Sequence, residues 1–192
     1  MKSLFIFSLA LLAVAVPGSA LTMTKIQGAC TSAEAGLTST IAFTGSSAVD
    51  GAGYATYNSP AYNAGTTVCG NDFLYQSSGI VTEIVFSTPI SYFGLAWGTP
   101  DPYNSLQLFN GATQLGPTFT GLDLASSFTA GTFYVNFYAG AGEQITKVVL
   151  SSSGCCFETD NHSYRIAAIP EPGSFALLAV PALLLAVRRR VS

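Results

Sequence analysis

Apolar and polar residues alternate in short runs along the middle of the chain, and turn-forming residues separate these runs. In residues 132–138, for example, Phe133, Val135 and Phe137 would share one face of an extended strand. No long run between residues 21 and 169 has the apolar spacing of an amphipathic helix. The pattern predicts strands over residues 40–43, 54–57, 80–86, 92–97, 106–109, 132–138, 146–151 and 164–169.

The dipeptide Asn110-Gly111 separates two such runs and is typical of a tight β-hairpin, because it accepts the positive φ of a type I′ turn. Residues 58–70 and part of residues 116–131 are expected to form loops. Many short strands joined by turns predict an all-β fold. We expect a single β-sandwich of jelly-roll type over residues 21–169.

The N-terminal end has the order of a secretory signal peptide. Lys2 is followed by an uncharged apolar run over residues 4–16 and then by small residues up to Ala20. We therefore expect residues 1–20 to direct export and to be removed after Ala20. The central domain would then fold outside the cytoplasm.

The C-terminal end carries three features in a fixed order. They are the tripeptide Pro170-Glu171-Pro172, an apolar stretch over residues 174–187, and the cluster Arg188-Arg189-Arg190. As a helix the stretch would be about 20 Å long, which is shorter than the ~30 Å hydrocarbon core of a bilayer. Terminal arginines favour the cytoplasmic side and can snorkel, so we expect a short transmembrane helix with its C-terminal end inside.

This arrangement resembles the PEP-CTERM signal, which is read by exosortases, membrane enzymes of bacteria that make exopolysaccharide. The resemblance implies that residues 170–192 are a sorting signal. It also implies that Glu171 and its flanking prolines are recognised by the sorting enzyme and take no part in catalysis. The precursor would be anchored in the inner membrane, and the processed protein would reach the cell surface or the extracellular matrix.

Two internal segments resemble the body of a subgroup of exosortase-dependent surface proteins. One is residues 89–104, which contain Trp97-Gly98, Asp101 and Tyr103-Asn104. The other is residues 148–153 followed by Phe157-Glu158-Thr159-Asp160-Asn161, where Cys155-Cys156 stands in place of the small or apolar residues that would be expected. The resemblance implies an architecture and a location, and it implies no mechanism.

The central domain is acidic. It contains three basic residues, Lys25, Lys147 and Arg165, and nine acidic ones, so its formal charge is near −6. An acidic surface repels phosphate backbones, so we expect no nucleic-acid partner. The same charge is compatible with cation binding and with solubility outside the cell.

All four cysteines, Cys30, Cys69, Cys155 and Cys156, lie in the part expected to be exported. An even number in an oxidising compartment favours disulfides. A bond between the adjacent Cys155 and Cys156 is not expected. Either Cys30 and Cys69 each pair with one of these two, or Cys30 pairs with Cys69 and leaves two free thiols. Zinc is disfavoured, because there is no Cys-x-x-Cys spacing and only one histidine.

No enzyme active site stands out in the sequence. His162 is the single histidine, no Gly-x-Ser-x-Gly motif is present, and we expect His162 to be a surface residue beside a turn. A glycosidase would need two carboxylates across a cleft, and no pair is evident. We therefore expect a non-catalytic protein, with a secreted hydrolase as the remaining enzymatic alternative.

Two binding hypotheses follow from the polar and aromatic residues. Asp101, Asn104, Asp160 and Asn161 offer the hard oxygen ligands that calcium prefers, although Asp and Asn also populate turns for local hydrogen bonding. A calcium site shared by all four requires their two segments to meet.

Aromatic residues offer stacking surfaces for sugar rings. Trp97 lies in an apolar run and is expected to be mostly buried, which leaves Tyr103 as the exposed platform. The first hypothesis is a surface or matrix protein associated with exopolysaccharide. The second is a calcium-assisted carbohydrate-binding module.

Overall fold

In a computed structural model of the chain, the described residues are 20–44, 47–58, 62–125 and 131–168. The predicted signal peptide lies outside this part except for Ala20, and so do the sorting-signal residues Pro170, Glu171, Pro172, Arg188, Arg189 and Arg190. Those assignments stay predictions. No helix within the described residues is long and apolar enough to cross a membrane.

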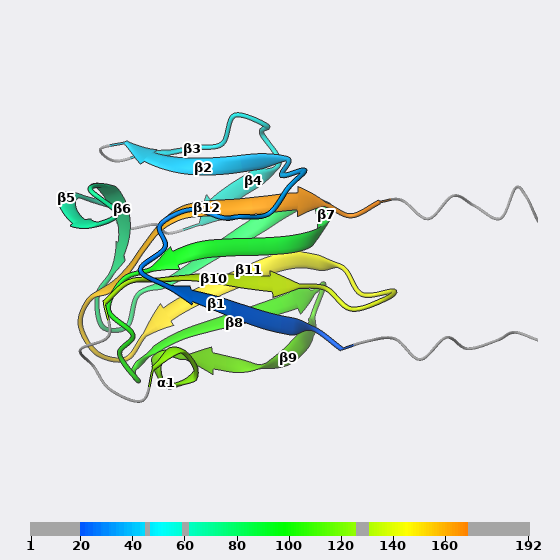
Figure 1. Ribbon diagram of the computed structural model, residues 1–192. Coiled ribbons are helices and arrows are strands. Elements are labelled where there is room, and N and C mark those ends of the chain that lie inside the picture. Colours follow the sequence, from blue (N-terminus) through cyan, green and yellow to red (C-terminus); the bar gives the residue numbers. More distant parts are fainter. Residues whose placement is uncertain (1–19, 45–46, 59–61, 126–130, 169–192) are drawn as a thin grey trace, which may run out of the picture.

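Strands make up most of the described chain, which confirms the all-β class (Figure 1). In chain order the elements are β1 (Thr22–Gln27), β2 (Ser39–Thr44), β3 (Ser47–Val49), β4 (Ala55–Asn58), β5 (Tyr62–Val68), β6 (Asn71–Gln76), β7 (Val81–Trp97), β8 (Asn104–Asn110), β9 (Thr113–Thr120), α1 (Gly121–Leu124), β10 (Phe133–Tyr138), β11 (Ile145–Ser152) and β12 (Phe157–Ile166).

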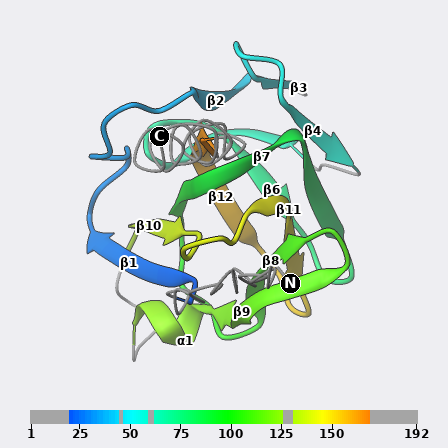
Figure 2. The same cartoon turned by 90° about the vertical axis from the view of Figure 1, so that its right-hand side faces the viewer.

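The described strands form one curled antiparallel sheet. Its main path is β3-β2-β12-β7-β11-β8-β9, with β1 attached through β10 and β5 attached through β6. Figure 2 shows β2 and β3 at the top and β8 and β9 at the bottom, with β7 and β12 between them. The finer assignment, a jelly-roll sandwich, stays a prediction.

Strand β7 explains the curl, because its two halves have different partners. The N-terminal half pairs with β4 and β11, and the C-terminal half pairs with β10 and β12. Between the halves, the β7–β11 register skips from Ile90 to Val85 around Pro89, which has no N–H to donate. Such an irregularity bends a strand. The two strands predicted over residues 80–86 and 92–97 are therefore one long, bent strand.

The main core fills the inside of the curl. Leu106, Leu108, Val148 and Leu150 of β8 and β11 are fully buried at alternate positions, as the sequence pattern predicts. Phe133, Val135 and Phe137 also face this core. Burial of each such side chain stabilises the fold by about 1.5–3 kcal/mol.

The opposite face of β7 and β10 is also covered, and we call it the outer face. Tyr134 and Ala96 are fully buried there, in a small cluster with Val68 and Phe73. The segment between β1 and β2 crosses this face, where the Ser32 hydroxyl lies 2.7 Å from the hydroxyl of Tyr92. Coverage on both faces explains why the last six residues of β7 are all buried.

Two connections differ from the predictions. The hairpin between β8 and β9 is confirmed, but Asn110 pairs with Thr113, and the two turn residues are Gly111 and Ala112. Only Gly111 of these has a positive φ, at 57°, which fits a turn with Gly at its first central position and not a type I′ turn. The loop predicted over residues 58–70 is wrong, because it contains β5, which pairs with β6.

Candidate functional site

Two loops meet at one end of the sheet, the β7–β8 loop and the β11–β12 loop. The Gly98 amide donates to the carbonyl of Glu158 at 2.8 Å, and the Ser153 amide donates to the carbonyl of Tyr103 at 3.0 Å. Within the first loop, the Asn104 amide donates to the Asp101 carbonyl at 3.2 Å. These backbone bonds hold Tyr103 beside residues 153–158.

The half-buried Tyr103 side chain packs on Gly154. A Cβ atom added at Gly154 would lie 2.6 Å from both Cγ and Cδ2 of the tyrosine ring, closer than real Cβ contacts. Glycine at position 154 therefore leaves room for the ring. The predicted platform residue is held in place by its neighbours.

Two carboxylates flank Tyr103. Burial, a hydrogen bond to Asp101 and the charges of Asp101 and Glu158 raise the pKa of the Tyr103 hydroxyl. Burial and the charge of Asp101 also raise the pKa of Glu158. The two carboxylates are therefore close enough to repel each other, a proximity that the sequence did not reveal.

No basic side chain compensates this pair within the described residues. Lys25 Nζ donates to the carbonyls of Asp123 and Leu124, both at 2.6 Å. The other two basic residues form ion pairs elsewhere, Lys147 with Glu83 at 3.0 Å and Arg165 with Glu34 at 3.6 Å. The end of the sheet that carries Tyr103 is consequently negative.

A disulfide between Cys155 and Cys156 completes this surface. Cys155 is exposed, and the Tyr75 hydroxyl lies 3.4 Å from its sulfur and 3.5 Å from the sulfur of Cys156. Tyr75 lies opposite Glu158 in the β6–β12 register. We call this group the Tyr103 surface, defined as Tyr75, Asp101, Tyr103, Cys155, Cys156 and Glu158; Asp101 is the most buried of them, with 8% of its surface exposed.

The disulfide pairing corrects the prediction in part. Cys30 is bonded to Cys69, with a Cα–Cα distance of 5.4 Å, which confirms one of the two alternatives for this pair. The alternative in which Cys30 and Cys69 each pair with Cys155 or Cys156 is wrong. Cys155 and Cys156 are bonded to each other, so the expectation that they would not form a disulfide is also wrong. The physical reason is that Cys30 and Cys69 meet over the outer face, whereas the adjacent pair lies in the β11–β12 loop.

Trp97 is not part of the surface. Its side chain is fully buried, and its ring centroid lies 4.5 Å from that of Phe157. The burial predicted from the apolar run is therefore correct, and Trp97 offers no exposed ring for a sugar.

Buried polar groups lie at the same end of the core. Gln76 is opposite Phe157 and Asn104 is opposite Ser152 in the strand registers, so both amides face the core. Both side chains are fully buried, and neither has a hydrogen-bond partner among the described residues. Groups of this kind are usually bridged by ordered water. Asn104, a predicted calcium ligand, is thus directed inward and away from the solvent.

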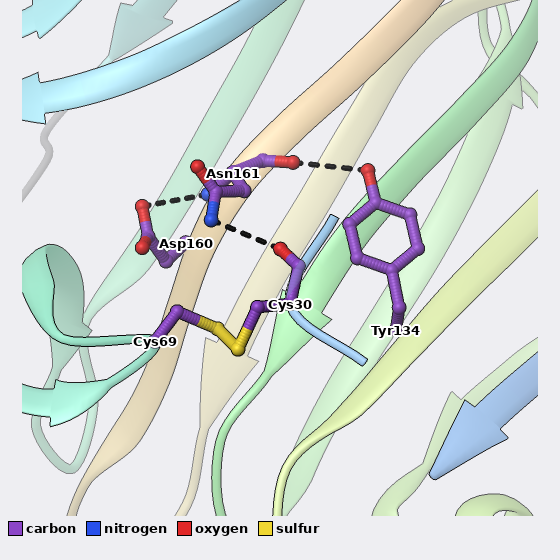
Figure 3. The surroundings of a disulfide bond; sticks show 5 residues. All are labelled: Cys30, Cys69, Tyr134, Asp160 and Asn161. Atoms are coloured by element: carbon purple, nitrogen blue, oxygen red, sulfur yellow. Dashed lines mark hydrogen bonds between the residues drawn. A yellow bond between two sulfur atoms is a disulfide. The ribbon is translucent and has the colours of Figure 1, made fainter. Parts of the chain in front are cut away.

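The other two predicted calcium ligands, Asp160 and Asn161, lie on β12, where Asp160 is opposite Ala96 of the outer face and Asn161 falls in an irregularity of the β7–β12 register. The Asn161 amide N–H donates to Asp160 Oδ1 at 2.6 Å, and its side-chain amide donates to the Cys30 carbonyl at 2.9 Å (Figure 3). Among the described residues, no hydrogen bond or ion pair joins Asp160 or Asn161 to Asp101 or Asn104. A site shared by all four therefore gains no support.

The part of the chain that the structure describes has no group of three or more His, Cys, Asp or Glu side chains that could hold a metal ion. Any cation site here would have to combine fewer carboxylates with amide, carbonyl or water oxygens.

His162 is fully buried in β12, so the prediction of a surface histidine is wrong. Its Nδ1 lies 2.8 Å from the Tyr57 hydroxyl and its Nε2 lies 2.9 Å from the Thr159 hydroxyl. Burial lowers the pKa of His162 to about 3. With both nitrogens engaged and no exposure to solvent, the imidazole is a packed core group.

Comparisons with known proteins add no relative to this picture. No family model, no curated protein and no solved structure matches the chain.

Proposed function

We propose that this chain is an exported, exosortase-sorted surface or extracellular-matrix protein that acts without catalysis by associating with exopolysaccharide. The signal-peptide pattern before Ala20 and the PEP-CTERM-like residues 170–192 support the sorting part of the proposal. In this role the C-terminal helix holds the precursor in the membrane, and an exosortase is the processing partner.

The single observation that carries the binding part is the position of Tyr103. Its ring packs on Gly154, beside the carboxylates of Asp101 and Glu158. A sugar presents apolar C–H groups that pack on an aromatic ring and hydroxyl groups that donate to carboxylates. An immobilised aromatic ring flanked by acceptors suits such a ligand, because little side-chain entropy is lost on binding.

A calcium-assisted carbohydrate-binding module is the second candidate. The observation that favours it is the mutual proximity of Asp101 and Glu158, with no basic partner among the described residues. Carboxylate oxygens are ligands that Ca²⁺ prefers, and a bound ion could take sugar hydroxyls as further ligands. The same two carboxylates would be the acid and the nucleophile or base of a secreted hydrolase, which is the third candidate.

One titration separates these candidates. The full-length chain, purified in a non-ionic detergent, is titrated against the exopolysaccharide of the producing organism and a glycan panel, with calcium and with a chelator. We expect saturable binding that persists in the chelator. Binding lost on chelation would favour the calcium-assisted module, and release of reducing sugar would favour the hydrolase. The absence of binding in both conditions would refute an association with carbohydrate.

Substitutions at Tyr103 test the proposed platform. Tyr103→Ala is expected to weaken binding at least about tenfold, because it removes the ring. Tyr103→Phe keeps the ring and should retain most of the affinity. Val49→Ala is the control for an exposed position at the other edge of the sheet, since Val49 is 52% exposed and lies on β3. Equal affinities for the Ala and Phe variants of Tyr103 would show that the ring does not contact the sugar.

A further inference from the structure

The disulfide between Cys155 and Cys156 differs from the Cys30–Cys69 disulfide in the length of chain that it closes. The two bonds have sequence separations of 1 and 39 residues. A disulfide stabilises a fold mainly by restricting the unfolded chain, and this effect grows with the length of the closed loop. The Cys155–Cys156 bond therefore restricts the unfolded chain less than the Cys30–Cys69 bond does, and global stability gives little reason for it.

The two disulfides also differ in exposure. Cys155 is exposed, whereas Cys30 and Cys69 are both partly covered. The Cys30 carbonyl accepts the side-chain amide of Asn161 at 2.9 Å (Figure 3), and Cys69 packs against the small apolar cluster on the outer face. A disulfide is reduced when a thiolate attacks one of its sulfur atoms, so access helps to decide which bond reacts. Cys155 offers the more accessible target.

A hydroxyl group lies beside both sulfur atoms of the adjacent pair. The Tyr75 hydroxyl is 3.4 Å from Sγ of Cys155 and 3.5 Å from Sγ of Cys156. When a disulfide is broken, one sulfur leaves as a thiolate, and a leaving thiol with a lower pKa leaves faster. A hydroxyl that donates to the thiolate stabilises its charged form and so lowers this pKa. Tyr75 is therefore placed to assist cleavage of the bond.

The backbone links this disulfide to the loop that carries Tyr103. The Ser153 amide donates to the Tyr103 carbonyl at 3.0 Å, and Gly154 leaves room for the tyrosine ring. Cys156 has a φ of 74°, a conformation that residues other than glycine rarely adopt. The ring that the disulfide closes through residues 155 and 156 restrains this conformation. Breaking the bond removes the restraint next to the contacts that hold Tyr103.

We propose that Cys155 and Cys156 form a reversible thiol–disulfide site, and that its reduction by a dithiol loosens the loop that carries Tyr103. A thiolate of the dithiol attacks Sγ of Cys155 and forms a mixed disulfide, while Sγ of Cys156 leaves as a thiolate that accepts a hydrogen bond from Tyr75. The second thiolate of the reductant then attacks the reductant's own sulfur in the mixed disulfide and releases Cys155. The dithiol loses two electrons and two protons, which the two cysteines take up. The site does not depend on sugar binding at the Tyr103 surface.

Selective reduction tests the redox part of the proposal. The full-length chain in non-ionic detergent is incubated with stepped concentrations of dithiothreitol without denaturant, free thiols are trapped with iodoacetamide, and peptide mass spectrometry assigns them. Cys155 and Cys156 should be labelled at a dithiothreitol concentration at least about tenfold below that required for Cys30 and Cys69, and oxidised dithiothreitol should restore the bond. Reduction of both bonds at the same concentration would overturn the proposal, and so would labelling of Cys155 and Cys156 before any reductant is added.

Tyr75→Phe tests the hydroxyl, because it keeps the ring and removes only the donor. It should slow the reduction of the Cys155–Cys156 bond at least about threefold, since the leaving thiolate loses its hydrogen bond. Reduction of the Cys30–Cys69 bond in the same samples is the internal control and should keep its rate. An unchanged rate for the Cys155–Cys156 bond would refute the role assigned to Tyr75.

Hydrogen exchange tests the coupling to Tyr103. In the selectively reduced chain, the Ser153 amide, which is bonded to the Tyr103 carbonyl, should exchange at least about tenfold faster. The Gly28 amide, which is hydrogen-bonded next to β10, is the control and should not change. The double variant Cys155→Ser/Cys156→Ser should show the fast exchange of Ser153 without reductant and no response to dithiothreitol. Equal exchange of Ser153 in the oxidised and the reduced chain would overturn the coupling.

Discussion

The burial of His162 predicts a specific loss of stability in acid. The imidazole is fully buried, and its pKa is about 3 in the folded protein, against about 6.5 in an unfolded chain. The unfolded state therefore takes up a proton first as the pH falls. The stabilisation that neutral His162 contributes is complete above pH 6.5 and is lost progressively between pH 6.5 and pH 3.

The magnitude follows from the separation of the two pKa values. Each pH unit between them changes the free energy of unfolding by about 1.4 kcal/mol, so the loss from pH 7.5 to 4.5 is about 3 kcal/mol. His162→Gln provides the comparison, because glutamine can bond to Tyr57 and Thr159 and does not titrate. The free energy of unfolding of the parent minus that of His162→Gln should therefore decrease by about 3 kcal/mol as the pH falls from 7.5 to 4.5.

The assay is urea unfolding at several pH values, in detergent and EGTA, followed by the fluorescence of Trp97. Trp97 is the single tryptophan and is fully buried, so its emission reports unfolding of the core. The carboxylates change the free energy of unfolding with pH in the same way in the parent and in His162→Gln. Their contributions therefore largely cancel when the two free energies are subtracted. A difference that stays constant to within about 1 kcal/mol from pH 7.5 to 4.5 would refute the reasoning, because a fully buried imidazole must respond.

Three further predictions concern other parts of the molecule. Gly154→Ala places a methyl group against the Tyr103 ring, so it should weaken glycan binding about tenfold with a small effect on the unfolding temperature; unchanged binding would contradict the packing described. Cys69→Ser breaks the bond to Cys30 and should lower the free energy of unfolding by about 2–4 kcal/mol in urea titrations, since a span of 39 residues is released; equal stability under oxidising conditions would be the contrary result. Glu171→Gln in the producing organism should leave an unprocessed, membrane-bound precursor that mass spectrometry detects, and normal release of the processed form would count against the sorting signal.

Local alternation predicted correctly which side chains face the core. Phe133, Val135 and Phe137 point inward, as their spacing indicates, because successive side chains of a strand lie on opposite faces. The same spacing places Tyr134 on the opposite face of the strand. That residue is nevertheless fully buried, because the segment after β1 and the β5–β6 hairpin cover the outer face. The segments that cover the outer face are distant in the sequence, so the alternation of residues within β10 does not reveal them.

The sequence predicted which residues could bind a ligand, but it did not predict which of them lie together in space. Tyr103 was selected from the sequence as a stacking platform, and Asp101, Asn104, Asp160 and Asn161 were selected as oxygen ligands. The sequence did not indicate that Glu158 lies near Asp101. Glu158 belongs to β12 and Asp101 to the β7–β8 loop, so the packing of distant segments decides their proximity.

The sequence by itself determined the all-β class, the hairpin after β8, the inward-facing residues and the acidic balance, because all of these depend on local spacing and composition. Only the tertiary structure decided that Cys30 bonds to Cys69, that His162 is buried, and which carboxylates meet. The physical reason is that strand pairing brings together residues far apart in the chain. Tyr75 and Glu158, for example, lie opposite each other because β6 and β12 pair in the sheet.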